Sequence, residues 1–184
     1  MAIGLIVVIV VVVLLLLWVA TTYNGLVKLR NRVDNAWAQI DVQLKRRLDL
    51  VPNLVETVKG YASHEAQTLE AVISARQQAI SAQGPRAEAQ ADNVLSGALR
   101  QLFALSESYP ELKANTSFLS LQEELSATEG RVAYARQFYN DAVLKNNTKI
   151  QQVPTVFIAK PFGFGEREYF EADDAAREAP RVQF

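Results

Sequence analysis

The chain has 184 residues, with 19 Lys and Arg against 20 Asp and Glu and a formal net charge of −1 at pH 7. Because the charges nearly balance, the chain as a whole has no bulk attraction to nucleic acid or to an anionic membrane, and we expect no nucleic-acid partner. Cysteine is absent and there is one histidine, which excludes disulfides, thiolate metal sites and thiol nucleophiles. The usual nucleophile, phosphate-loop and metal signatures are also missing, so we expect no enzyme, no cofactor and no metal site.

Residues 3–20 form an apolar run without a charge, which Thr21 and Thr22 extend. In hydrocarbon every backbone polar group must be satisfied internally, so such a run spans as a helix of about 20 residues. The sequence therefore predicts a transmembrane anchor over residues 1–22, with Trp18 and Tyr23 as interfacial anchors. A cleaved signal peptide is the alternative. It is disfavoured because the run has no basic start, exceeds the usual apolar core of about 7–15 residues and lacks an A-x-A site.

Cations follow the span directly, at Lys28, Arg30 and Arg32, with Asp34 as the one acid beside them. The positive-inside rule then leaves the bulk of the chain in the cytoplasm of a single-pass protein. We expect Trp18, Tyr23, Lys28 and Arg30 to lie at the membrane interface.

Helical periodicity dominates residues 23–151. The first apolar stripe runs from Val33 to Ala62 at spacings of three and four, and it begins close behind the span. One helix is therefore expected to run from lipid into water, weakened at Asn24-Gly25 and kinked by Pro52. A second pattern follows, with Ser63 as its expected cap and Glu65 in its first turn, and it either forms a separate helix up to the stop at residues 83–85 or continues the first helix. Later patterns cover residues 85–107 and 111–150.

Breaks at residues 83–85 and 108–110 separate these later patterns, and Ser96 is expected to be exposed on the third helix. The predicted fold class is all-α: an N-terminal transmembrane helix continues into an elongated antiparallel helical bundle over residues 23–151. Residues 152–184 form an irregular, aromatic and glycine-containing tail. A turn is expected at Gly163-Phe164-Gly165.

Aromatic side chains gather in that tail and are the candidate oligomer or membrane contacts: Phe157, Phe162, Phe164, Phe170 and Phe184. Rings flanked by Lys160 and Arg167 suit a membrane interface, because one end of an interfacial ring is wet. Packing against the chain's own bundle is the alternative.

Two charged groups on the predicted helices have a functional and a plain interpretation. Arg46-Arg47 with Asp49 is either a phosphate or lipid-headgroup site or, the favoured interpretation, a solvated helix face with local ion pairs. The carboxylates Glu123, Glu124 and Glu129 suggest acid–base chemistry, but no partner base is evident and a surface role is favoured.

Other polar groups are weighed in the same way. His64 beside Glu65 is a pH-responsive pair or, preferably, part of a capping turn. Asp173-Asp174 is a cation site or, preferably, a solvated acidic pair. The asparagines form a polar seam that fixes the register of the bundle or serve as exposed and capping residues, with neither interpretation favoured: Asn115, Asn140, Asn146 and Asn147.

Short segments spread over almost the whole chain resemble the LemA family, in order and with the expected gaps. They include Tyr23-Asn24, Ala36-Trp37, Asp41 through Arg47, Asp49 through Val55, Lys59-Gly60-Tyr61, His64-Glu65, Tyr109-Pro110, Asn115, Glu123-Glu124-Leu125, Glu129, Ala135-Arg136, Tyr139-Asn140, Phe162-Gly163-Phe164, Tyr169-Phe170 and Pro180-x-Val182-x-Phe184. Any one segment is a weak signal, whereas the ordered set is specific.

The resemblance implies a bacterial membrane protein with an N-terminal membrane helix, an α-helical bundle and no established enzymatic activity. A magnetosome protein related to this family is tied to the formation of internal membranes. The favoured function is a non-enzymatic scaffold that self-assembles as a homo-oligomer in membrane lipid and organises or shapes the bilayer. The alternative is an adaptor or sensor that binds another membrane protein.

Overall fold

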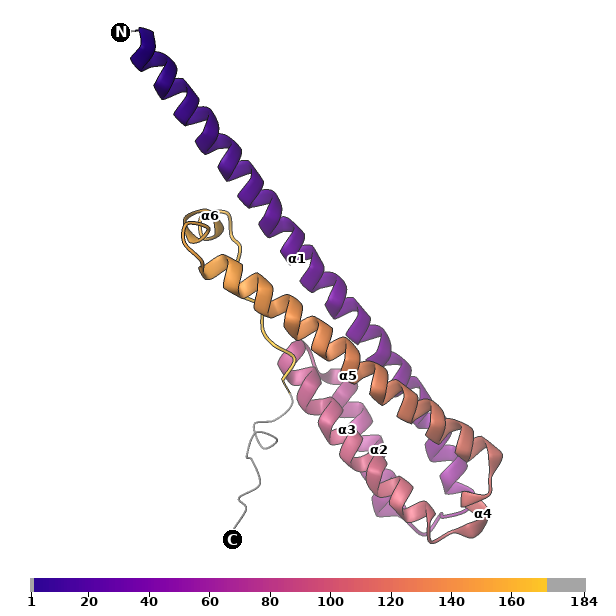
Figure 1. Ribbon diagram of the computed structural model, residues 1–184. Helices are drawn as coiled ribbons and strands as arrows, with labels where there is room; N and C mark the ends of the chain where they lie inside the picture. The colour runs from indigo at the N-terminus through magenta and orange to yellow at the C-terminus, as the bar shows by residue number, and fades with distance from the viewer. Residues whose placement is uncertain (1, 172–184) are drawn as a thin grey trace, which may run out of the picture. The chain divides into compact units, whose positions relative to one another are not determined.

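A computed structural model describes residues 2–171, and every regular element within them is a helix. Figure 1 shows their order, which is α1 (Ala2–Lys59), α2 (Ala66–Ser81), α3 (Pro85–Ser106), α4 (Pro110–Lys113), α5 (Thr116–Gln151) and α6 (Val156–Ala159). The predicted fold class is confirmed, since one long apolar N-terminal helix is followed by a helical bundle.

The described residues fall into two compact units. Unit 1 comprises residues 2–38 and 138–167, and unit 2 comprises residues 39–137 and 168–171. Helices α1 and α5 each contribute one part to both units.

Helix α1 continues without interruption through the two positions where weakness was expected, Asn24-Gly25 and Pro52. Proline has no N–H, so Pro52 leaves the carbonyl of Leu48, four residues earlier, without its helical donor. In unit 2 the Arg76 side chain of α2 fills that place, because its Nε donates to the Leu48 carbonyl oxygen at 2.9 Å. A donor from another helix thus compensates for the proline.

The core of unit 2 is aliphatic and draws on α1, α2, α3, α4 and α5. Its most buried members include Val51, Leu54, Val58, Val72, Leu99, Leu102, Leu112 and Phe118. Helices α2 and α3 run antiparallel and are joined by residues 82–84, where Gly84 has a φ of 87° that suits glycine.

Three local predictions in unit 2 are wrong. Ser63 does not cap α2, which begins at Ala66 after an N-cap position occupied by Glu65 without a side-chain cap bond. Ser96 is buried on α3 rather than exposed. The pattern over 111–150 is split between Lys113 and Thr116, because the Asn115 side chain accepts the N–H of Phe118 at 2.9 Å and starts a new helix there.

Unit 1 pairs the first part of α1 with the end of α5 and with α6. A small apolar cluster holds it together, made of Leu26, Ile150, Ile158, Ala159 and Phe164, with Val19 and Val27 against it. Further along α1, the half-buried Trp37 packs on Tyr139 with ring centroids 5.4 Å apart. The apolar stripe of α1 therefore has a neighbour in its own chain from Leu26 onward.

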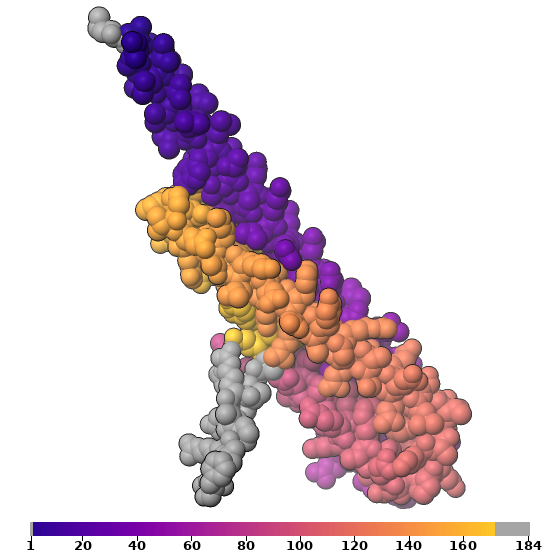
Figure 2. Space-filling view, viewed as in Figure 1, coloured from indigo at the N-terminus to yellow at the C-terminus, as the bar shows by residue number. Residues whose placement is uncertain are grey.

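The N-terminal part of α1 is different. The apolar side chains of residues 3–17 are all exposed, and Figure 2 shows this stretch of helix uncovered by the other residues of unit 1. Its most apolar 18-residue window has a mean hydropathy of 3.5 and no buried residue. By length and composition, α1 is the one helix among residues 2–171 that qualifies to cross a membrane.

Candidate functional site

The first candidate site is the end of the apolar run and the turn that packs on it. Helix α6 and the residues after it, 156–165, bring three rings together and are called the aromatic turn below. Tyr23 of α1 contacts Phe162 at 5.3 Å and Phe164 at 5.5 Å between ring centroids, both edge-on. Edge-to-face pairs of this kind contribute about 0.5–1.5 kcal/mol beyond the burial of area.

Backbone geometry in the aromatic turn explains why position 163 is a glycine. Gly163 has a φ of 73°, and the next N–H, that of Phe164, donates back to the Ala159 carbonyl oxygen at 2.9 Å. Such a left-handed residue ends a helix and turns the chain back over it. The predicted turn at Gly163-Phe164-Gly165 is therefore present, and it directs Phe164 toward Tyr23.

Polar contacts fix the chain that leaves the aromatic turn. The Asn147 side chain accepts the N–H of Arg167 and donates to its carbonyl oxygen, both at 2.9 Å. The Arg167 guanidinium then reaches Asp34 of α1 at 2.6 Å. Asn146 and Asn147 are both buried here, so these two residues form a polar seam between α5 and the tail.

The four predicted interface residues lie on the α1 part of unit 1, at and just after the end of the exposed apolar stretch. Trp18 and Tyr23 are each 37% exposed, and Lys28 is exposed on α1. Arg30 is exposed too, and its guanidinium carbon lies 5.4 Å from the centre of the Phe164 ring. Interfacial aromatic residues followed by cations are the arrangement that a membrane anchor favours.

The candidate aromatic contacts separate into two kinds. Phe157 is 71% and Phe162 56% exposed, whereas Phe164 and Phe170 are buried. Phe184 and the pair Asp173-Asp174 lie outside the described residues. Only Phe157 and Phe162 of the described candidates therefore have surface to offer a lipid or a neighbouring copy.

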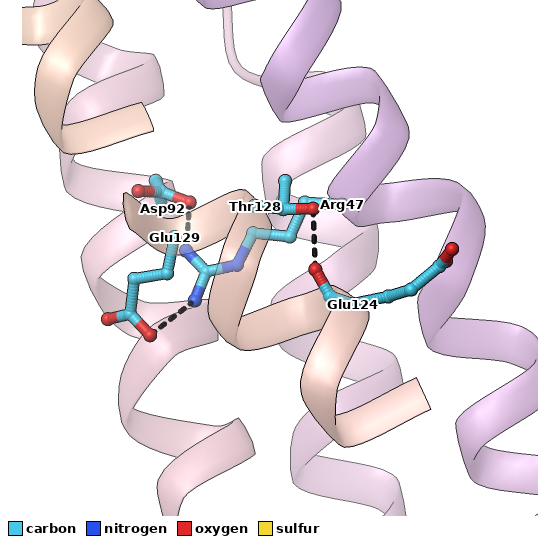
Figure 3. A network of polar contacts seen from close by, with 5 residues as sticks. All are labelled: Arg47, Asp92, Glu124, Thr128 and Glu129. Atoms are coloured by element: carbon cyan, nitrogen blue, oxygen red, sulfur yellow. Dashed lines mark hydrogen bonds and ion pairs between the residues drawn. The ribbon is translucent and has the colours of Figure 1, made fainter. Parts of the chain in front are cut away.

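The second candidate site is a charged network in unit 2, drawn in Figure 3. Arg47 is 2% exposed and its Nη1 lies 2.6 Å from Oδ1 of Asp92 on α3, while its Nη2 lies 3.7 Å from Glu129 of α5. In the same view the Thr128 hydroxyl donates to the carbonyl oxygen of Glu124. The Glu124 carboxylate also pairs with Arg46 at 3.6 Å.

The favoured interpretation of Arg46-Arg47 is thus wrong for Arg47. Arg46 is solvated as expected, but its ion-pair partner Glu124 lies on α5 and not on the same helix face. Arg47 follows Leu44 by three residues and precedes Val51 by four, so its spacing already placed it on the apolar stripe. The neighbouring Leu48 has an equally good spacing from Leu44 and Val51 and is apolar, which makes the position of Arg47 on the stripe easy to overlook. A buried ion pair across helices fixes which faces meet, and leaving one partner unpaired is costly.

Burial and charge oppose each other at the acidic residues of unit 2. Burial raises the pKa of Asp92, and the facing Arg47 opposes that rise without cancelling it. Burial likewise raises the pKa of Glu88, against a hydrogen bond that its carboxylate accepts from the Gly84 N–H. Glu123 and Glu124 are exposed, and residues 2–171 hold no group of three or more His, Asp or Glu arranged to bind a metal ion.

The remaining polar candidates are His64, Asn115 and Asn140. His64 is exposed in the loop before α2, and its neighbour Glu65 accepts the Tyr109 hydroxyl at 2.9 Å. Asn115 caps α5 and also donates to the Tyr61 hydroxyl at 2.9 Å. Asn140 is half-buried on α5.

Comparison with known proteins gives a consistent result. The model of the LemA family matches residues 36–184. Protein LemA of Metamycoplasma hominis is 26% identical over 159 residues, covering 84% of this chain and 71% of its own length. Magnetosome protein MamQ 2 of Paramagnetospirillum magneticum and magnetosome protein MamQ of Magnetospirillum gryphiswaldense are each 24% identical over 179 residues, covering 83% of this chain and 66% of their own. The chain thus spans just under two thirds of the MamQ proteins' length.

Proposed function

This chain belongs to the LemA family, and from that premise we propose that it is a non-enzymatic scaffold anchored in a bacterial membrane. In this proposal many copies assemble through the first helix and the aromatic turn, and the assembly organises or shapes the bilayer. An N-terminal helix apolar enough to span, together with relatives named as magnetosome proteins, fits a membrane-anchored protein. Self-assembly of the chain and shaping of the bilayer are the parts of the proposal that go beyond anchoring.

One observation carries the proposal: an exposed aromatic surface lies directly at the end of the membrane helix. Phe162 contacts Tyr23, the first residue after Thr22, yet more than half of its surface is open. Phe157 of the same turn is more open still. Apolar surface held at that level favours either the bilayer interface or the same turn of a neighbouring copy.

Identical copies that meet through identical surfaces adopt a fixed mutual geometry. When each copy also carries a membrane helix, that geometry sets the angle between neighbouring spans. A ring or lattice of such copies therefore imposes a curvature or a boundary on the lipid.

The test compares the full chain with a Phe157→Ser/Phe162→Ser double variant, and with Leu119→Ser as the matched control. Leu119 is 47% exposed on the unit 2 part of α5, so its substitution removes apolar surface that does not belong to unit 1. We expect a large defined homo-oligomer by light scattering in mild detergent, and altered vesicle shape by electron microscopy. The double variant should lose both properties and the control should keep them.

A wild-type chain that stays monomeric at micromolar concentration and leaves liposomes unchanged would refute the scaffold. A monomer that co-purifies with one other membrane protein would favour the adaptor. One observation favours the adaptor. Ile73 and Ile80 are exposed two turns apart on one face of α2, where a partner helix could pack.

A further inference from the structure

A polar pocket of about 280 Å³ lies beside the aromatic turn in unit 1. Its lining combines two arginines, the buried Asn146 and the backbone of the turn: Arg30, Asn146, Gly163, Phe164, Gly165, Glu166 and Arg167. None of the contacts described for the membrane anchor or for the scaffold accounts for this pocket.

The two arginines differ in what already holds them. Arg167 is fixed through its backbone by Asn147 and through its guanidinium by Asp34. Arg30 is positioned over the Phe164 ring and makes no ion pair among the described residues. Its planar guanidinium is therefore oriented by a ring and free to bind an anion, the geometry that suits bidentate contact with phosphate.

Glu166, the acidic residue of the lining, forms no ion pair with Arg30. The Glu166 carboxylate accepts from the Gln151 side chain at 2.9 Å, which ties it to α5. Asp34, which lies outside the lining, already pairs with Arg167, so Arg30 is the cation that the pocket has to offer an anion.

The pocket lies close to the level where the membrane helix leaves the hydrocarbon. Tyr23 directly follows the apolar run, and the Phe164 ring that lines the pocket is 5.5 Å from the Tyr23 ring. Arg30 comes eight residues after Thr22, about 12 Å along the helix axis, and its side chain can reach back toward the headgroups. Lipid phosphate is the anion present at that depth.

The distribution of charge along the chain also favours the binding of an anion by unit 1. Outside the apolar run, residues 23–38 and 138–167 carry seven Lys and Arg against three Asp and Glu, a net charge of +4. All other residues together are net negative, since the whole chain has a formal charge of −1. The cationic excess therefore belongs to the unit that carries the span.

We propose that this pocket binds a phosphate group, and that the group comes from the headgroup of an anionic phospholipid in the bilayer the anchor spans. Arg30 is the principal ligand, with Arg167 and the Asn146 side chain beside it. The inference rests on the membrane anchoring within the proposed function, and it is independent of self-assembly. It gives each copy a specific lipid contact in addition to its apolar helix.

The experiment uses the full chain in nanodiscs made of equal parts phosphatidylethanolamine and phosphatidylglycerol. Lipid that stays with the protein after gentle release is counted by native mass spectrometry. Arg30→Gln is the test variant. Arg32→Gln is the matched control, because it removes the same charge two residues away on α1, where Arg32 lies over Phe138 outside the pocket.

We expect Arg30→Gln to lower phosphatidylglycerol retention about tenfold, as the loss of a charge-assisted hydrogen bond would. Arg30→Lys, which keeps the charge and loses the planar fork, should fall between Arg30→Gln and wild type. Arg32→Gln should stay within about twofold of wild type. Melting curves of each variant show that loss of lipid is not loss of fold.

Equal losses in Arg30→Gln and Arg32→Gln would mean diffuse attraction to anionic lipid and would overturn the pocket. Competition by soluble glycerol phosphate would overturn the lipid source and show that the pocket takes free phosphate. Particle mass measured on the same samples separates the two proposals. If the chain fails to assemble but still retains phosphatidylglycerol, only the scaffold is refuted. If it assembles but fails to retain the lipid, only this inference is refuted.

Discussion

The Nε of Arg76 on α2 donates to the carbonyl oxygen of Leu48 on α1 at 2.9 Å, within unit 2. Leu48 lies four residues before Pro52, and a proline cannot supply the N–H that a helix would place there. The arginine therefore completes a helix that the sequence leaves one hydrogen bond short.

This relationship predicts a coupling between Arg76 and Pro52. Arg76→Met should cost about 1.5–3 kcal/mol in the wild-type background, because it leaves the half-buried Leu48 carbonyl without a donor. In a Pro52→Ala background the new backbone N–H can take over, so the same substitution should cost at least about 0.5 kcal/mol less. Urea unfolding of the full chain in mild detergent, followed by circular dichroism, measures both differences.

Gln77→Met is the matched control for that cycle, because Gln77 is the exposed neighbour of Arg76 and both residues are good helix formers. It should be close to neutral in both backgrounds. Equal costs of Arg76→Met with and without Pro52 would show that the arginine acts elsewhere.

The helices themselves could be predicted because apolar spacing and breakers are local signals. Helix α3 begins at Pro85 as expected, with Gly84 as its N-cap, although α2 already ends at Ser81. The long α1 followed from a stripe that begins close behind the apolar run. The break between α4 and α5 at Asn115 was not predicted, because an asparagine inside an apolar periodic pattern can either cap a new helix or continue the existing one.

The candidate sites were harder to predict because their partners lie far apart in sequence. Arg47 meets Asp92 across 45 positions and Asp34 meets Arg167 across 133, and no spacing rule connects them. The aromatic content of the tail pointed to a contact surface. Both Phe162 and Phe164 pack on Tyr23, and only the apolar cluster of unit 1, which includes Phe164 but not Phe162, separates the buried ring from the open one.

The second prediction concerns Arg47. Arg47→Ala leaves Asp92 largely buried without its cation, a loss that typically costs about 3–5 kcal/mol. The control is Arg46→Ala, which breaks an exposed pair with Glu124 at 3.6 Å and should cost no more than about 1 kcal/mol. Thermal melting of the full chain compares them, and similar losses in the two variants would contradict an internal role for Arg47.

The third prediction concerns pH and Glu88. Burial raises its pKa above the usual value of 4.5, so the folded chain holds this proton more tightly than the unfolded chain. The resulting contribution to stability is fully present below pH 4.5 and is lost as pH rises through the raised pKa. Glu88→Gln, which keeps an oxygen for the Gly84 N–H, should therefore melt higher than wild type near pH 7.

That advantage should shrink as the pH falls through the raised pKa of Glu88, because the folded wild type then takes up the proton. Glu70→Gln on the exposed side of α2 serves as the control for the removal of one negative charge. An advantage of Glu88→Gln that is the same at every pH would exclude titration of this carboxyl as the cause.

The fourth prediction concerns the aromatic turn. Gly163→Ala places a side chain at a φ of 73°, a left-handed conformation that costs an L-residue about 1–2 kcal/mol. Gly165→Ala is the matched control, since Gly165 has no positive φ and its added methyl group would meet open space. Hydrogen exchange at the Phe164 amide, which donates to Ala159, should speed up in the first variant alone. Unchanged exchange in Gly163→Ala would show that the turn does not depend on glycine.

The fifth prediction concerns the side of the membrane on which the helical bundle lies. The cations Lys28, Arg30 and Arg32 after the span favour the cytoplasm, so a cysteine at Ser74 should resist an impermeant thiol reagent in intact cells. Ser74 is exposed on α2, and no native cysteine competes for the reagent. A cysteine at Ala2, at the other end of the apolar run, should label readily. Labelling at Ser74 with protection at Ala2 would reverse the orientation, whereas permeabilised cells must label at both positions for the comparison to count.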